Sequence, residues 1–477
     1  MSDATLTDTT PYPLLRELSN ELGWGLAVVR AAVLQAALPQ IAAALADQST
    51  FVTHPWRRLH NTMASVERLL DEDAAVRERE VARLNRLHAR ITGAGPNGTS
   101  YSGLDPEGRA WVIATLFESS VTMRRNSGRA LDWSAQEQLY AEFRRLLAAF
   151  GDDASVLPEQ LSRFWPYYQQ MLSERLEHTD AVDAVLYRLL DAVPPPPVLR
   201  DQRTAWAAVR SIAGPVAARV TVASLPPTFR ERVRIDSPVL SDALMVGAYR
   251  GSGLATLALP VLSNPWTLAS VMDGDGDGDQ SASPLFGALL RGASAFTSVV
   301  RAARPAQPAA SGPNRDAEPW PAQRFFVNVL DQTGDGTVSW PDLAALAREV
   351  ASRLDLDADR ETEVYDAFHG WWRELSAALD TDGDGVVSLQ EYVAGSANLP
   401  APALVRLADV LFEVTDVDGS GTISAQEYRK LLHTGFSHEL PGPPGADLTK
   451  SAFTTEFMHF MAGRRPSTAW ERLTTDS

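Results

Sequence analysis

Cysteine is absent from this chain of 477 residues. Its absence excludes disulfide bonds, cysteine-ligated zinc, iron–sulfur clusters and a cysteine nucleophile. Lysine occurs only at Lys430 and Lys450, and the chain carries a net charge of −17. Because nucleic acids bind clusters of basic residues, we expect no nucleic-acid partner.

Long uninterrupted apolar runs are also lacking. Residues 1–15 have no basic segment followed by an apolar core, so the sequence predicts no signal peptide. The best candidate for a membrane-spanning helix, residues 244–262, is interrupted by the charged Arg250 and contains three glycines. We therefore expect no integral membrane span and a cytoplasmic protein.

Apolar residues recur at helical spacing through most of the chain, and no run alternates as a strand would. The pattern predicts an all-α fold with a large helical domain at 1–262 and a second helical domain at 321–477. The intervening residues 263–320 are rich in Pro, Ala, Gly and Ser, which predicts a flexible linker with one possible helix at 284–303. Ser134 and Glu137 have the spacing of a helix-starting capping box.

The negative charge is concentrated in the last third of the chain. Residues 321–477 have a net charge of −13, which leaves only −4 for residues 1–320. This imbalance indicates a cation-binding C-terminal domain.

Three stretches of twelve residues in this acidic region fit the EF-hand template, 331–342, 380–391 and 416–427. Calcium is a hard ion that takes six to eight oxygen ligands, and loop positions 1, 3, 5, 7, 9 and 12 supply them. These positions predict two to three calcium sites. The predicted ligands are Asp331, Thr333, Asp335, Thr337, Ser339 and Asp342; Asp380, Asp382, Asp384, Val386, Ser388 and Glu391; and Asp416, Asp418, Ser420, Thr422, Ser424 and Glu427.

The three loops differ in their closing residue. Asp342 is one methylene shorter than the usual glutamate, so we expect the first loop to bind calcium more weakly or to tolerate magnesium. Because EF hands work in pairs, we expect a fourth hand at 441–453. It keeps an apolar residue, Leu448, but has no ligand set. This third of the chain resembles the calerythrin and sarcoplasmic calcium-binding protein family, through its four hands, one degenerate, and the Trp371–Trp372 pair.

His88 and Arg58 with Thr62 are the candidate functional residues of the N-terminal domain. His88 falls on the apolar stripe of its predicted helix, where a histidine needs a hydrogen-bond partner or a ligand. Arg58 and Thr62 are one turn apart beside the buried face of the preceding helix. These patterns by themselves fit a structural role at least as well as a functional one.

Residues 25–235 resemble the oxygenase family that includes latex clearing protein (rubber oxygenase) and the mycophenolic acid side-chain oxygenase. The matching segments include HPWRRLHNT at 54–62, RLHARITG at 86–93 and YSGLDPEGRAWVIATLFESS at 101–120. The resemblance implies an all-α fold that holds one haem b, with His88 as the proximal ligand. It also implies that Arg58 and Thr62 lie on the open face, where dioxygen binds.

The leading interpretation is a haem-dependent oxygenase that acts on a hydrophobic substrate, of isoprenoid or secondary-metabolite type, fused to a calcium-binding domain. The alternative is a non-catalytic calcium sensor or buffer whose helical domain binds a lipid or a protein partner. A third class is an enzyme on the same scaffold without haem, such as a hydrolase or isomerase. Because the predicted linker is loose, we expect calcium to act structurally rather than as a regulator.

Overall fold

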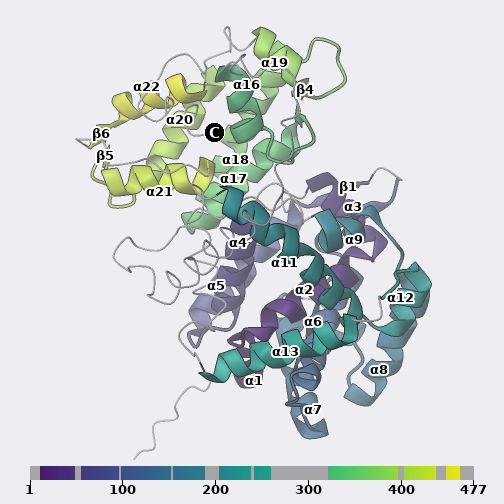
Figure 1. The fold of residues 1–477 in the computed structure, drawn as a ribbon. Coiled ribbons are helices and arrows are strands. Elements are labelled where there is room, and N and C mark those ends of the chain that lie inside the picture. The colour runs from purple at the N-terminus through teal and green to yellow at the C-terminus, as the bar shows by residue number, and fades with distance from the viewer. Residues whose placement is uncertain are drawn as a thin grey trace, which may run out of the picture. The chain divides into compact units, whose positions relative to one another are not determined.

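The structure, a computed structural model, describes residues 11–48, 55–95, 98–151, 154–188, 203–237, 241–258, 321–395, 402–436 and 447–461. The chain divides into two compact units, Met1–Gln307 and Pro308–Ser477 (Figure 1). The division falls inside the predicted linker, which lies with its expected helix outside the described residues. The predicted all-α class is confirmed in both units.

Helices of the N-terminal unit surround one apolar core. They are α1 (Pro13–Ser19), α2 (Gly23–Ala36), α3 (Pro39–Gln48), α4 (Pro55–Leu69), α5 (Ala74–Ala89), α6 (Pro106–Asn126), α7 (Trp133–Ala149), α8 (Leu161–Gln170), α9 (Asp180–Asp183), α11 (Arg203–Ser224), α12 (Pro227–Val233) and α13 (Ser241–Ala258). A 3₁₀ turn (Ala154–Val156) and two π-helical turns (Met171–Arg175 and Ala184–Arg188) join some of them. One antiparallel hairpin, β1 (Thr92–Ala94) with β2 (Ser100–Ser102), follows α5 and was not expected from the sequence.

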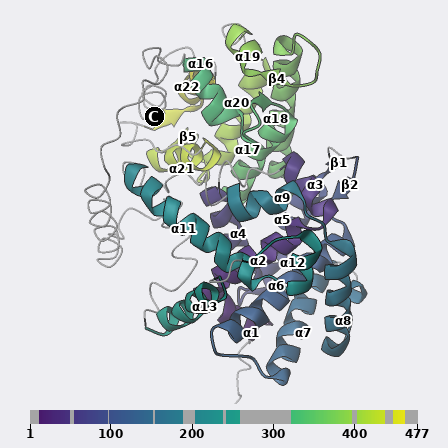
Figure 2. The same ribbon diagram turned by 45° about the vertical axis from the view of Figure 1, so that its right-hand side comes forward.

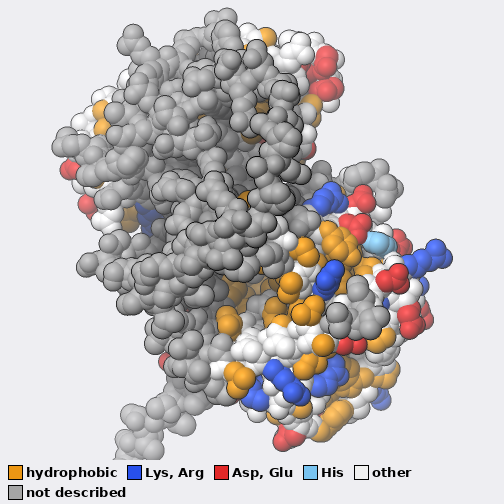
Figure 3. All heavy atoms as spheres, in the orientation of Figure 1, with side chains coloured by type: hydrophobic (Ala, Val, Ile, Leu, Met, Phe, Trp, Pro, Cys, Tyr) orange, Lys and Arg blue, Asp and Glu red, His pale blue; other side chains and the backbone are white. Residues whose placement is uncertain are grey.

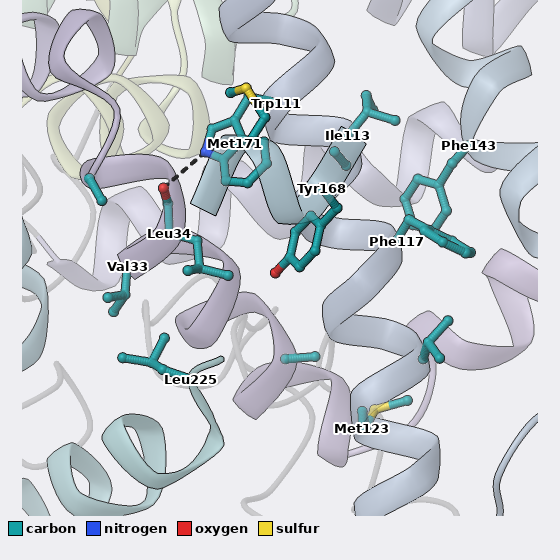
Figure 4. Close-up of a cluster of buried hydrophobic side chains, with 14 of the residues drawn as sticks. Val33, Leu34, Trp111, Ile113, Phe117, Met123, Phe143, Tyr168, Met171 and Leu225 are labelled. Atoms are coloured by element: carbon teal, nitrogen blue, oxygen red, sulfur yellow. Dashed lines mark hydrogen bonds between the residues drawn. The ribbon is translucent and has the colours of Figure 1, made fainter. Parts of the chain in front are cut away.

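Helices α2 and α6 lie side by side at the centre of this unit in both ribbon views (Figures 1 and 2). The α6 helix begins where the Asp105 carboxylate accepts a hydrogen bond from the Gly108 N–H (2.7 Å). Trp111 is fully buried, and its indole N–H donates to the Leu34 carbonyl of α2 (2.9 Å; Figure 4). The Tyr168 ring of α8 stacks on Trp111 with centroids 5.5 Å apart, which ties a third helix to the pair.

The start of α7 differs from the expected capping box. Asp132, not Ser134, is the N-cap, and its side chain accepts from the Ala135 N–H (2.8 Å). The Glu137 carboxylate instead accepts from the Trp133 indole (2.7 Å). Asp132 and Ser134 both have good capping side chains, and Asp132 has the extended backbone that an N-cap requires.

The C-terminal unit consists of helices joined by short loops and two small strand pairs. Its helices are α16 (Pro321–Phe325), α17 (Trp340–Arg353), α18 (Ala358–Leu379), α19 (Leu389–Gly395), α20 (Pro402–Thr415), α21 (Ala425–Phe436) and α22 (Lys450–Met461). The π-helical turn Phe326–Leu330 continues α16. Strand β3 (Thr337–Val338) pairs with β4 (Val387–Ser388), and β5 (Thr422–Ile423) pairs with β6 (Leu448–Thr449).

No single helix among the described residues is both long and apolar enough to cross a membrane. One pair, α2 with residues Pro39–Ala46, is long and apolar enough when its two helices are taken together, but it is bent by 99°. Figure 3 shows apolar side chains scattered among charged ones on the visible face of the N-terminal unit. Exposed large apolar residues of that unit include Val216 of α11 and Leu254 of α13. Isolated exposed apolar side chains are ordinary on protein surfaces.

Candidate functional site

The second calcium loop assembles its carboxylates on one side of a tight turn. Oxygens of Asp380, Asp382 and Asp384 lie within 4.8 Å of one another. The closing Glu391 accepts from the Thr381 N–H at loop position 2 (2.8 Å). Such a group of hard oxygens is the ligand set that calcium takes.

The third loop also gathers three carboxylates. Oxygens of Asp416, Asp418 and Glu427 lie within 4.8 Å of one another. Glu427 accepts from the Val417 N–H, again at loop position 2 (2.9 Å). The bend at position 6 is made by Gly421 with φ +77, a conformation that other residues adopt only with strain. Loops two and three therefore share the bond from position 2 to the closing glutamate, whereas the gathered carboxylates come from positions 1, 3 and 5 in loop two and from positions 1, 3 and 12 in loop three.

The first loop keeps the turn but differs in its closing residue. Asp342 is fully buried, whereas Glu391 and Glu427 are half-buried. Its carboxylate accepts from the N–H of Thr333 at position 3 (2.9 Å), one residue further along than in the other loops. Among the described residues, no group of three carboxylates comes together in this loop as in the other two.

These loop environments shift the pKa values of the closing carboxyl groups in opposite directions. Hydrogen bonds from the backbone N–H groups of Ser388 and Thr381 lower the pKa of Glu391 to about 2. Burial raises the pKa of Asp342 above its ordinary value, despite bonds from Thr333 and Ser339. The second loop therefore favours a charged closing residue, and the first loop opposes one.

The loops are paired as expected. Val338 lies opposite Val387 across β3 and β4, and Ile423 lies opposite Leu448 across β5 and β6. Val338, Val387 and Ile423 are fully buried. The structural pairing predicted for the fourth hand is confirmed by the partner of Leu448; residues 437–446 of that hand lie outside the described part of the chain.

The three candidate residues of the N-terminal unit lie on two facing helices. The Arg83 guanidinium of α5 donates to Ser65 Oγ of α4 (2.8 Å), and a short connection makes the two helices antiparallel. In antiparallel helices, a residue that follows Arg83 on α5 lies beside residues that precede Ser65 on α4. His88 is five residues after Arg83, so it lies at the same height along the helix pair as the turn of α4 that contains Arg58 and Thr62. His88 is half-buried and Thr62 is exposed; the Arg58 side chain lies outside the described residues.

The turn that contains His88 is covered by the chain leaving the β1–β2 hairpin. A Cβ atom added at Gly103 would lie 2.6 Å from the His88 carbonyl oxygen, so only glycine allows this approach. His88 Nδ1 is shielded from solvent. Close packing therefore fixes the backbone of this turn, and the half-buried His88 imidazole is a side chain that can ligate a metal centre.

A buried ion pair at the centre of the same unit was not found from the sequence. Arg30 of α2 pairs with Glu118 of α6, and Tyr168 Oη donates to the same carboxylate (2.9 Å). Arg30 Nε donates to the Ser224 carbonyl (2.7 Å), and the Thr122 hydroxyl donates to Glu118 (2.8 Å). The sequence did contain an indication of this pair, because Arg30 and Glu118 each interrupt a strongly apolar helical segment.

Comparison with known proteins agrees with both units. The model of the family described as ER-bound oxygenase mpaB/B'/Rubber oxygenase, catalytic domain, matches residues 16–257, which is about half of the chain. An EF-hand model matches residues 377–394 and 407–432. A solved calcium-binding protein of Streptomyces coelicolor, described in relation to prokaryotic calcium-mediated regulation, is 19% identical, with a TM-score of 0.26. That match covers 30% of this chain and 96% of the other. None of the curated proteins matches.

The fold and sites define an all-helical oxygenase domain followed by EF hands. The chain belongs to the family of mpaB-type and rubber oxygenases, in a form that also contains an EF-hand domain. Membership implies an oxygenase that uses dioxygen and a small-molecule substrate.

Proposed function

We propose that this protein is a haem-dependent oxygenase of hydrophobic substrates, with calcium bound in its EF-hand domain. One observation supports haem binding. His88 lies at the same height along the α4–α5 pair as the turn that contains Arg58 and Thr62, within a domain of an oxygenase family. The residues present fit a haem with one histidine ligand, because the imidazole of His88 is half-buried and its Nδ1 is shielded from solvent.

Each of the three residues has a defined task in this proposal. His88 would hold the cofactor, and the close approach of Gly103 fixes the backbone of its turn. Haem, when bound, supplies the activation of dioxygen. Arg58 would supply a guanidinium that can stabilise developing negative charge, and Thr62 would supply a hydroxyl that can hydrogen-bond a water molecule or the substrate. A substrate with an electron-rich double bond or an activated C–H bond, such as an isoprenoid, fits this chemistry.

The test is optical and uses the purified full chain reconstituted with haem. We expect the wild type to show a Soret band and to contain iron, and His88→Ala to lose both. His178→Ala is the matched control, because His178 is exposed and contacts Asp183 (2.9 Å) outside the candidate site. A wild type that stays colourless would contradict haem binding and favour the non-catalytic calcium sensor.

We also propose that calcium stabilises the EF-hand domain rather than switching the oxygenase. The supporting observation is that carboxylates gathered within 4.8 Å repel one another until a cation arrives. Removal of calcium with a chelator should lower the melting temperature of the EF-hand domain and leave oxygenase turnover unchanged. A steep rise of turnover with calcium, without any change in the melting of the helical domain, would contradict this role.

A further inference from the structure

The backbone hydrogen bond that joins the first calcium loop to its preceding helix spans one residue more than in the other two loops. Asp331 N–H donates to the Phe326 carbonyl five residues earlier (2.8 Å), which is a π-helical bond. Asp380 and Asp416, the first residues of the other loops, donate to carbonyls four residues earlier (both 2.9 Å). The first loop therefore begins in a different register relative to its preceding helix.

The hydrogen bond that closes the first loop is also shifted by one residue. The Asp342 carboxylate accepts from the N–H of position 3, while those of Glu391 and Glu427 accept from the N–H of position 2. The shorter side chain explains this displacement, because an aspartate needs a donor that lies closer to it. The result is a loop that is closed by its own backbone donors around a fully buried carboxylate.

The position-5 acid of the first loop accepts from the N–H of position 7, as Asp384 of the second loop does, and has the hydroxyl of Thr337 as an additional donor. Asp335 Oδ1 accepts from both the N–H and the hydroxyl of Thr337 (2.8 Å each). Position 3 of this loop is Thr333, which brings no charge. The first loop thus has fewer acids than the second, and they are not gathered into one group in the described structure.

We propose that each EF pair of this protein binds a single calcium ion, opposite a partner loop that holds none. In the first pair, the second loop binds the ion and the first loop supplies β3 as a preformed partner for β4. In the second pair, the third loop binds the ion and the fourth hand supplies β6 to β5. The inference rests on the proposed calcium binding of the second and third loops.

This arrangement has a thermodynamic consequence. Two ion-binding loops of a pair can be coupled, because the ion in one loop orders the strand that the other loop uses. With one ion per pair, no such coupling arises within a pair. The ion-free loops instead order the strand partners before calcium arrives, which lowers the entropy that binding must overcome.

Calorimetric titration of the calcium-depleted full chain tests the proposal by stoichiometry. We expect two calcium ions per chain. The matched variants are Asp335→Ala and Asp384→Ala, because both side chains are exposed, hold position 5 of their loops and accept from the N–H of position 7. Alanine removes the ligand oxygen, which asparagine would keep. Asp335→Ala should leave two ions with unchanged affinity, and Asp384→Ala should leave one tight site.

Asp418→Ala extends the test to the third loop and should also leave one tight site. Magnesium titrated into the calcium-saturated chain should produce no binding heat that Asp335→Ala removes. A third ion, of calcium or magnesium, that disappears in Asp335→Ala would overturn the proposal. If no calcium binds at all, the proposed function of the domain fails, which is a different outcome from a third ion.

Discussion

Substitution of Glu118 by glutamine tests the buried ion pair of the oxygenase domain. Arg30 is 1% exposed, and Glu118 is the acidic side chain that contacts it among the described residues. Burial alone would lower the pKa of Arg30, but Glu118 raises it, so the guanidinium stays charged. Glu118→Gln removes the negative charge and leaves a buried cation, which costs about 3–5 kcal/mol of unfolding free energy.

The effect should be large in a calorimetric melting experiment. For a domain of this size, each kcal/mol shifts the melting temperature by about 2–4 °C, so we expect a decrease on the order of 10 °C. Measurements with and without chelator identify the calcium-independent transition as that of the oxygenase domain.

Two further variants control this experiment. Thr122→Val removes one hydroxyl donor to Glu118 and should cost only about 1 kcal/mol. Arg30→Met combined with Glu118→Leu removes both charges and should recover most of the stability lost in Glu118→Gln. A Glu118→Gln melting temperature within about 2 °C of the wild type, or a double variant less stable than Glu118→Gln, would refute the argument that the pair compensates a buried charge.

Three other predictions follow from particular contacts. Asp132→Ala should destabilise the oxygenase domain by about 1 kcal/mol in urea unfolding, while Ser134→Ala leaves it unchanged, because Asp132 is the N-cap of α7. Ile423→Ala should cost the EF-hand domain about 2–5 kcal/mol in thermal unfolding, since the side chain is fully buried opposite the fourth hand. Burial raises the pKa of Tyr140 and of Tyr168 above the ordinary 10.0. The unfolded chain therefore ionises first, so stability is full below pH 10 and falls as the pH rises above it, as phenolate absorbance and unfolding curves should show. Phenolate absorbance of both residues at pH 10 in the folded chain would contradict their burial.

The sequence predicted the calcium loops well because their chemistry is local. Ligands at fixed intervals and a glycine at the bend specify the loop within twelve residues, so Asp380 to Glu391 could be assigned without any tertiary information. The pairing of Leu448 followed from the same periodicity, because the apolar position of each hand recurs. Helical periodicity likewise predicted the all-α class.

Predictions that depended on competition between local signals were less successful. Ser134 and Asp132 are both suitable caps, and only the backbone conformation at Asp132 selected it. The hairpin Thr92–Ser102 was missed because each strand has only three residues, too few for an alternating pattern.

Distant contacts were beyond the sequence altogether. Arg30 and Glu118 are 88 residues apart, and their pairing depends on how α2 packs against α6. The placement of His88 level with Arg58 and Thr62 depends in the same way on the alignment of α4 with α5. The sequence by itself determined the helices and the calcium loops, since both arise from residues close together in the chain. Only the tertiary structure decided which helices meet, which charges are buried together and where Asp342 closes its loop, because these depend on packing that no short segment contains.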